Sequence, residues 1–466
     1  MPDRQAIPIL EISDAFADAA IPANFPAAML RYRNTEWAAA VGLAALSEIE
    51  WVQHFARFEP LPSNLPHPLA MRYHGHQFGV YNPDIGDGRG FLLAQMQDGE
   101  GRWLDLGTKG SGQTLWSRQG DGRLTLKGGV REVLASSYLE ALGVNTSKCL
   151  SLIETGEQLH RGDEPSPARS SVMVRLVHSH IRFGTFQRAA YEENTEGMAR
   201  LVEHCIRHYH PSADDPDMAR KTSGLLERIS EATARMIGQW MAAGFVHGVM
   251  NTDNFNITGE TFDFGPYRFM LNSDPNFVAA YFDHQGLYRF GRQPGQGLWA
   301  LQQLASALTL LVEPADLAEA LKVYEPAYQR SFASHTLKLL GLKSGALADD
   351  LEFISLFYSW MTEVEAAWPQ TFFDWFGGEA STARALAGPQ SALYERADFA
   401  AVRSAIEARV PDRPERISED YFQRTKPASL LIDEIEALWA RIADEDDWSA
   451  FEDKLSEFEI LRLALL

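Results

Sequence analysis

Residues 244–265 read GFVHGVMNTDNFNITGETFDFG, and this stretch places two carboxylates and an amide close together in the chain. Asp253 and Asn254 end a predicted loop, and Asp263 follows nine residues after Asn254. The residues between them predict a hairpin over 254–264, which would bring Asn254 and Asp263 face to face. Because Mg²⁺ takes one or two protein carboxylates together with phosphate oxygens, the stretch predicts a magnesium–nucleotide site.

The spacing within this stretch resembles the catalytic loop and the later DFG segment of protein kinases. His247 and Asn254 match the two ends of the kinase HRDxxxxN loop, but Val249 stands where the catalytic Asp belongs. The usual kinase base is therefore missing. Asp253 is the candidate base instead, and it would act on a differently placed substrate.

Composition limits the classes of protein that the chain can belong to. It has 466 residues, 45% of them hydrophobic, which is enough for a large core and for two lobes. The net charge of −21 disfavours binding to nucleic acid or to an anionic membrane, so a phosphate site must be a local basic pocket. Two cysteines and an acidic first twenty residues predict a cytoplasmic protein without disulfides, leader or membrane span.

We expect an α+β protein with a bilobal, protein-kinase-like fold. The predicted parts are an N-terminal extension (1–59), an N-lobe (60–177), a mostly helical C-lobe (178–400) and an acidic helical C-terminal region (401–466). Within the extension, a single helix is expected at about 36–58.

Two glycine-rich turns in the predicted N-lobe are candidates for phosphate binding. The first, GDGRG, contains Gly86, Gly88 and Arg89 and is flanked by apolar segments typical of hairpin strands. The second, QGDGR, contains Asp121 and Gly122. Glycines let backbone amides approach phosphate oxygens closely, and an arginine adds a charge-assisted contact. Plain glycine-rich turns remain the alternative.

Four charged residues are candidates for a polyphosphate clamp. Lys109 ends a predicted strand, and Glu132 lies on a predicted helix over 127–142, from which it could pair with Lys109. Arg175 and Arg182 follow near the predicted lobe junction, and arginine binds phosphate bidentately. Solvated side chains or structural ion pairs are equally compatible with the sequence.

A histidine pair further along the chain has the spacing of metal ligands. His204 and His208 share one face of a predicted helix. Since no second pair with recognisable spacing completes a tetrahedral site, ordinary histidines on a helix surface are the favoured interpretation.

Taken together, these motifs make the chain similar to the selenoprotein O family of pseudokinase-like protein adenylyltransferases. The matching segments occur in family order: GHQFG and GDGR (75–89), LGTKGSG (106–112), SRQGDGR (117–123), VREVLAS (130–136), RFGTF (182–186), HGVMNTDN (247–254), DFGP (263–266) and QPGQGLW (293–299).

The resemblance implies transfer of AMP from ATP to Ser, Thr or Tyr hydroxyls of proteins, with release of pyrophosphate. ATP would lie end for end relative to a kinase, with its α-phosphate at the acceptor. Asp253 would be the base, and Asn254 and Asp263 would bind Mg²⁺ or Mn²⁺. The nucleotide contacts would come from Gly86, Gly88, Arg89, Lys109, Asp121, Gly122, Arg175, Arg182 and Asp263, with Glu132 as the partner of Lys109.

The chain also departs from the family, because it has no cysteine beyond Cys205 where relatives carry a C-terminal redox motif. Two other functions stay open. One is a small-molecule kinase of the aminoglycoside-phosphotransferase type, although such enzymes keep an Asp where Val249 stands. The other is a non-catalytic, ATP-binding pseudokinase.

Overall fold

The computed structural model describes residues 7–162 and 164–465 and confirms the α+β class. Its largest sheet has eight strands in the described chain, in the order β1-β3-β6-β7-β10-β9-β2, with β8 paired to β10. The pairs are antiparallel throughout. The strands are β1 (Ala17–Ala19), β2 (Met29–Arg33), β3 (Leu69–Met71), β6 (Leu92–Gln97), β7 (Trp103–Lys109), β8 (Leu124–Thr125), β9 (Lys148–Leu159) and β10 (Ala168–Val177).

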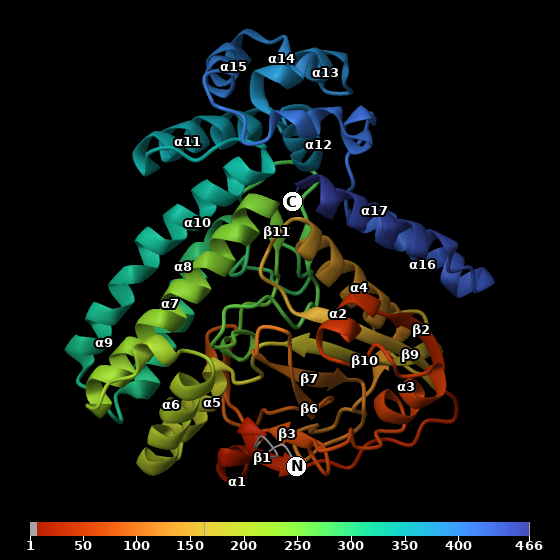
Figure 1. Ribbon diagram of the computed structural model, residues 1–466, viewed down its shortest axis with the longest axis vertical. Helices are drawn as coiled ribbons and strands as arrows, with labels where there is room; N and C mark the ends of the chain where they lie inside the picture. The colour runs from red at the N-terminus through yellow and green to blue at the C-terminus, as the bar shows by residue number, and fades with distance from the viewer. Residues whose placement is uncertain (1–6, 163, 466) are drawn as a thin grey trace.

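The two faces of this sheet are covered by different helices (Figure 1). Because strand residues alternate between faces, Val172 and Val174 pack with α3 (Glu48–Phe55), whereas Met173 packs on the side of α4 (Leu126–Ala141). Helix α4 matches the predicted helix over 127–142. Thr125 caps it by accepting a hydrogen bond from the backbone N–H of Gly128 at 3.2 Å.

Residues 7–59 contribute two strands, β1 and β2, to this sheet. Strands β1 and β2 pair with β3 and β9, and the single helix expected at about 36–58 is wrong. Two helices, α2 (Thr35–Ala40) and α3, replace it, because Gly42 adopts a φ of 76° between them and ends the helical path. On α3, Trp51 is fully buried and donates to Ser151 Oγ at 2.9 Å.

The remaining chain is largely helical and forms two groups. The first group lies beside the sheet, and its longest members, α7 and α10, run alongside each other (Figure 1). Its members are α5 (Phe183–Tyr191), α6 (Thr195–His208), α7 (Met218–Ala243), α8 (Gln293–Leu308), α9 (Pro314–Ala320) and α10 (Tyr324–Leu339). The second group consists of α11 (Leu347–Glu363), α12 (Trp368–Asp374), α13 (Thr382–Ala387), α14 (Ser391–Tyr394), α15 (Ala400–Glu407), α16 (Ile432–Glu445) and α17 (Ser449–Leu465).

The C-terminal region packs back onto α4. The Tyr138 and Phe458 rings lie 4.8 Å apart, and the Tyr138 hydroxyl donates to the Ala428 carbonyl oxygen at 3.2 Å. Helix α17 is therefore acidic outside, as predicted, and apolar where it meets α4. In the described part of the chain, each helix is too short or too polar to cross a lipid bilayer.

Two predicted hairpins differ from the structure. The hairpin predicted over 254–264 is wrong, because Asn256 bridges to Arg182 and Thr261 bridges to Thr146, so the two limbs pair with other segments. The apolar segment before GDGRG also does not pair with β6. It forms its own pair, β4 (Gly75–Gln77) with β5 (Val80–Asn82), and β3 pairs with β6.

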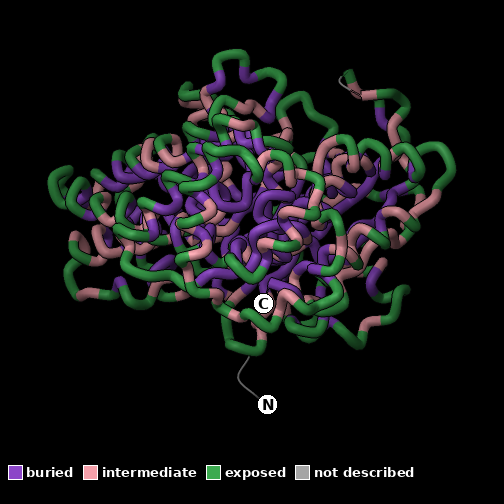
Figure 2. Tube along the Cα trace, turned by 90° about the horizontal axis from the view of Figure 1, so that it is seen from above, coloured by how far each residue is buried: buried purple, intermediate pink, exposed green. Residues whose placement is uncertain are grey.

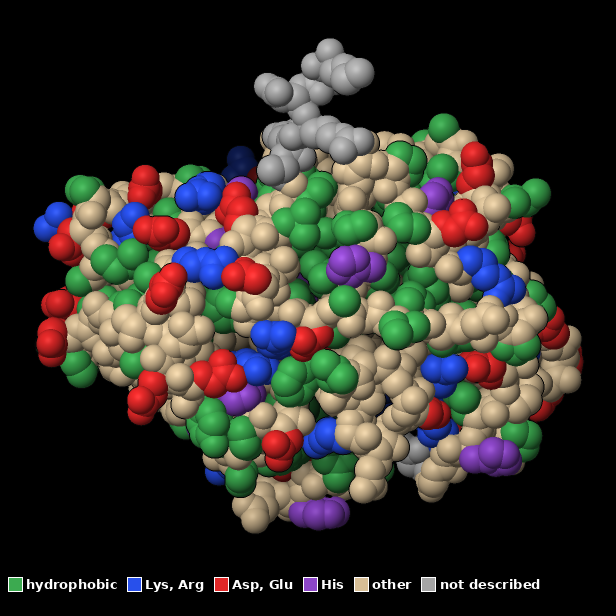
Figure 3. Space-filling model, turned by 90° about the horizontal axis from the view of Figure 1, so that it is seen from below, with side chains coloured by type: hydrophobic (Ala, Val, Ile, Leu, Met, Phe, Trp, Pro, Cys, Tyr) green, Lys and Arg blue, Asp and Glu red, His purple; other side chains and the backbone are tan. Residues whose placement is uncertain are grey.

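Buried residues fill the middle of the molecule, and exposed ones form its outer shell (Figure 2). On the face shown in Figure 3, acidic and basic side chains lie interspersed and do not gather into one basic patch. Another small antiparallel pair joins β11 (Phe245–Val246) to β12 (Arg268–Phe269). These two strands lie at the start and just beyond the end of the stretch 244–265.

Replacing Trp51 with Ala tests whether residues 7–59 are integral to the fold. We expect Trp51→Ala to lower the free energy of unfolding by about 3–5 kcal/mol, because it leaves a large cavity and an unpaired Ser151 hydroxyl. Chemical denaturation measures the change. Ile49→Ala on the same helix is the control, since Ile49 is 74% exposed, and its effect should stay within about 0.5 kcal/mol. Equal stabilities of the two variants would contradict this packing.

Candidate active site

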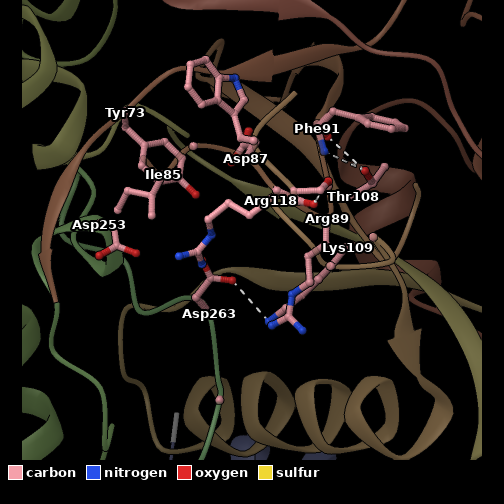
Figure 4. Close-up of a pocket in the computed structure, with 18 of the residues that line it drawn as sticks. Tyr73, Ile85, Asp87, Arg89, Phe91, Thr108, Lys109, Arg118, Asp253 and Asp263 are labelled. Atoms are coloured by element: carbon pink, nitrogen blue, oxygen red, sulfur yellow. Dashed lines mark hydrogen bonds and ion pairs between the residues drawn. The ribbon is translucent and has the colours of Figure 1, made fainter. Parts of the chain in front are cut away.

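A cavity of about 750 Å³ opens between the large sheet and the segment 249–265 (Figure 4). Its wall contains eleven of the twelve residues predicted for the site, and Glu132 lies just behind it. The eleven are Gly86, Gly88, Arg89, Lys109, Asp121, Gly122, Arg175, Arg182, Asp253, Asn254 and Asp263.

Asp263 lies at the centre of the charged groups in this cavity. Its Oδ1 atom lies 2.9 Å from Arg175 Nη1 and 3.3 Å from Lys109 Nζ, and its Oδ2 lies 2.8 Å from Arg182 Nη1. Burial raises the pKa of this carboxyl, but Arg175, Lys109 and Arg182 together hold it well below its usual range. The backbone of Asp263 has a φ of 59°, an uncommon conformation that aims the side chain at the cations.

Lys109 and Glu132 form a buried ion pair between β7 and α4. The predicted pairing of these two residues is therefore present in the structure. Arg175 Nη1 lies 4.0 Å from Glu132 Oε2, so the same glutamate also faces a second cation. The pair fixes the Lys109 amine at the cavity wall.

Arg182 links three parts of the site. Its Nη1 atom donates to the backbone oxygen of Asp253 at 2.8 Å, in addition to its contact with Asp263. Its Nη2 lies 3.3 Å from Oδ1 of Asp87, whose Oδ2 accepts from the Met71 N–H at 3.0 Å. This arginine thus joins the glycine turn at Asp87, the backbone at Asp253 and the carboxylate of Asp263.

Asp253 has the environment expected of a proton acceptor. Burial raises the pKa of its carboxyl to about 6, and Asp263 adds to the increase, while Arg182 opposes it. Its Oδ1 atom is buried and has no hydrogen-bond partner within the residues that the structure describes. A side chain at Gly75 would place its Cβ only 3.0 Å from this atom, so glycine there leaves room for the carboxylate.

Asn254 and Asp263 supply the oxygen atoms that a hard divalent cation prefers. Both line the cavity, and the Asn254 amide nitrogen donates to the Val249 carbonyl oxygen at 2.9 Å. This bond fixes the amide orientation and leaves the side-chain oxygen available as a ligand. The donor set therefore fits Mg²⁺ or Mn²⁺.

The glycines of the two turns also allow close packing beside the cavity, while their contact with phosphate stays a prediction. A Cβ at Gly86 would lie 2.5 Å from the Trp116 ring, and a Cβ at Gly88 would lie 2.9 Å from the Trp116 carbonyl oxygen. Gly122, with a φ of 69°, similarly presses against Gly112. These glycines allow two loops to pack closely beside the cavity.

The outer wall carries further charges. Asp121 is exposed and pairs with Arg161 at 2.7 Å, and this pairing helps to hold the pKa of Asp121 low against the effect of burial. Arg89 is also exposed, and Figure 4 shows Arg118 reaching into the same space. Cations therefore line the cavity from its interior to its mouth in a protein whose net charge is −21.

Sequence reasoning missed Asp87, Trp116 and Arg161. Asp87 stands between Gly86 and Gly88, so its place in GDGRG was a usable signal. Arg161 comes from the connection between β9 and β10, a segment with no motif, and only the fold brings it to Asp121.

Comparison with known proteins shows which family the chain is similar to. A family model described as "Protein adenylyltransferase SelO" matches residues 6–459. A relative from Synechocystis sp., named "Protein nucleotidyltransferase YdiU", is 40% identical over 487 residues, covering 97% of each chain. Relatives of the same name from Synechococcus elongatus and Gloeobacter violaceus are 40% and 41% identical, covering 96% and 95% of this chain and 93% and 92% of their own.

The family model and the relatives define an enzyme of the nucleotidyltransferase class. More specifically, the chain belongs to the protein adenylyltransferase SelO family.

Neutralising Asp263 tests the electrostatic balance of the site without any ligand. We expect Asp263→Asn to lower the free energy of unfolding by about 3 kcal/mol, because Arg175 and Arg182 lose their main counter-charge in a buried setting. Thermal and chemical denaturation measure this loss, and added tripolyphosphate should recover part of it. The control Asp121→Asn removes an exposed pair and should change stability by no more than about 1 kcal/mol. An Asp263→Asn variant as stable as the wild type would show that Asp263 is not the main counter-charge of these arginines.

Proposed function

We propose that the protein transfers AMP from ATP to Ser, Thr or Tyr hydroxyls of other proteins and releases pyrophosphate. Membership of the family supports this proposal, as do the names of the relatives. The observation that carries it is the single cavity in which Asp253, an aspartate without a partner for its Oδ1, lies with the cation cluster around Asp263. We also propose that the fold is a bilobal, kinase-like one, with the sheet domain and helical domain on either side of this cavity.

The cations of the cavity are proposed to bind the polyphosphate. Lys109, Arg175 and Arg182 are preorganised by Glu132, Asp263 and Asp87, so their positions need little change when phosphate arrives. Preorganised charges in a site shielded from water stabilise developing negative charge much better than mobile ones do. Arg89, Asp121 and Gly122 are proposed to contact the nucleotide nearer the mouth.

The placement of the acids supports a nucleotide turned end for end relative to a kinase. Val249 offers no base at the kinase position, while Asp253 lies four residues further along the same loop. A base at Asp253 fits an acceptor hydroxyl that meets the α-phosphate. In this proposal, the loop carries the base for a reaction at the α-phosphate, whereas a kinase reacts at the γ-phosphate.

The proposed step is an in-line displacement at the α-phosphorus. The acceptor oxygen forms a bond to this phosphorus, and the bond to the oxygen bridging to the β-phosphate breaks. The hydroxyl proton passes to Asp253, which is largely ionised at neutral pH because its pKa is about 6. The charge that develops on pyrophosphate is balanced by Lys109 and the two arginines.

Asn254 and Asp263 are the residues proposed to hold Mg²⁺, or Mn²⁺ in its place. A bound divalent ion would supply further positive charge to the phosphates. Coordination by Asp263 requires this carboxylate to share its oxygens between the ion and the cations that it now contacts. The proposed partners are ATP and cytoplasmic proteins that offer a hydroxyl.

Parallel incubations with α-labelled and γ-labelled ATP test the proposed reaction. We expect label from the α position to appear on protein, with an added mass of AMP by intact mass spectrometry. Asp263→Ala should abolish this labelling, because it removes a proposed metal ligand. Transfer of γ-label alone would identify a phosphotransferase, and nucleotide-induced thermal stabilisation without any transfer would identify a pseudokinase.

Removing the proposed base tests the assignment of Asp253. We expect Asp253→Asn to lower the single-turnover rate of AMP transfer by about 10²- to 10⁴-fold, the usual range for loss of a general base. ATP affinity, measured by calorimetry, should change much less, since the cation cluster is intact. The exposed Asp274 provides a matched control, Asp274→Asn, with an unchanged rate. An unchanged rate in Asp253→Asn would reject the assignment.

A further inference from the structure

The N-terminal turn and helix α6 meet at a cluster of three metal-binding side chains outside the active site. Glu11 ends the short 3₁₀ helix at Pro8–Glu11, and His204 and His208 lie one turn apart on α6. One ligand atom from each residue lies within 4.8 Å of the other two. The structure thus brings a third ligand, 193 residues away from His204 in the chain, to the histidine pair.

The geometry of the three ligand atoms fits a small tetrahedral cation. Glu11 Oε2 lies 3.1 Å from His204 Nδ1 and 3.1 Å from His208 Nε2. Two ligands about 2.0 Å from a tetrahedral zinc ion lie roughly 3.3 Å apart, so small adjustments would admit the ion. Two histidines four residues apart on a helix, joined by a glutamate, are a known zinc-binding combination in proteins.

The chemistry of the individual side chains also suits a metal. His204 is buried, and its Nδ1 atom faces the Glu11 carboxylate. The Nε2 atom of His204 is buried and unpartnered within the described chain, so its polar contact is made through Nδ1 alone. Glu11 and His208 keep 32% and 14% of their side chains exposed, which leaves a path for the ion and a water.

Two arginines border the cluster. Arg207 Nη1 lies 3.2 Å from Glu11 Oε2, but its side chain is 61% exposed and can turn into solvent when a cation arrives. Arg200 pairs with Asp14 at 2.7 Å and donates to the backbone oxygen of Glu11, so it does not compete for the carboxylate. Of these two arginines, only Arg207 would have to leave the Glu11 carboxylate when a cation binds.

We propose that Glu11, His204 and His208 bind a Zn²⁺ ion, with water as the fourth ligand. The ion ties the N-terminal turn to α6. This turn leads into β1, where Asp18 pairs with Arg72 and accepts from the Trp116 indole N–H at 3.2 Å. The metal site thus anchors the segment that supports the wall of the active-site cavity, and its function is structural.

Zinc titration of the chelator-treated full chain tests this proposal. In buffer with excess Mg²⁺, which occupies the oxygen ligands of the cleft, calorimetry should detect one Zn²⁺ site. Zinc should raise the melting temperature and slow hydrogen exchange over residues 8–16. Co²⁺ should give the intense visible absorption typical of a four-coordinate site.

Variants of the ligands decide the outcome. We expect His208→Gln and Glu11→Gln each to weaken Zn²⁺ binding at least about 10-fold and to remove the zinc-dependent protection of residues 8–16. The exposed His67 provides the control, and His67→Gln should bind as the wild type does. Both ligand positions are partly exposed, so the variants should fold. If Glu11→Gln does not fold, His208→Gln tests the proposal by itself. A wild type that binds no Zn²⁺, or unchanged binding by His208→Gln, would overturn the proposal.

Discussion

One carboxylate, that of Asp263, holds together the parts that form the cavity. Its three cationic partners come from β7, from β10 and from the residue that precedes α5. A carboxylate and cations buried apart from each other would each carry a large desolvation cost, so they are stable only in mutual contact. The Asp263 carboxylate thus joins two strands of the sheet to the segment 249–265 across the cavity.

Local features of the sequence were sufficient to predict the elements that carry the site. The strand ending at Lys109 and the helix carrying Glu132 follow from apolar periodicity, which depends on a few neighbouring residues. Their ion pair follows once both elements exist. The kinase-like spacing around Asp253 and Asp263 then predicted which residues would share one cavity, and the structure places them there. What each residue does in catalysis stays a prediction.

Contacts between distant segments could not be predicted in this way. The limbs of 254–264 alternate as a hairpin would, but buried neighbours at Arg182 and Thr146 compete for the same backbone groups and pair with them. The edge strands β1 and β2 are short, so their periodicity is weak, and the sheet to which they belong is formed by later residues. Likewise, a glutamate at position 11 has no signal that relates it to two histidines on α6.

The packing of α17 against α4 has a consequence for the active site. Since the rings of Tyr138 and Phe458 are in contact, residues near the end of the chain clamp the helix that carries Glu132. A helix held from outside cannot swing away from the sheet without detaching the C-terminal region. The C-terminal region thereby restrains α4 and, through Glu132, the ion pair with Lys109.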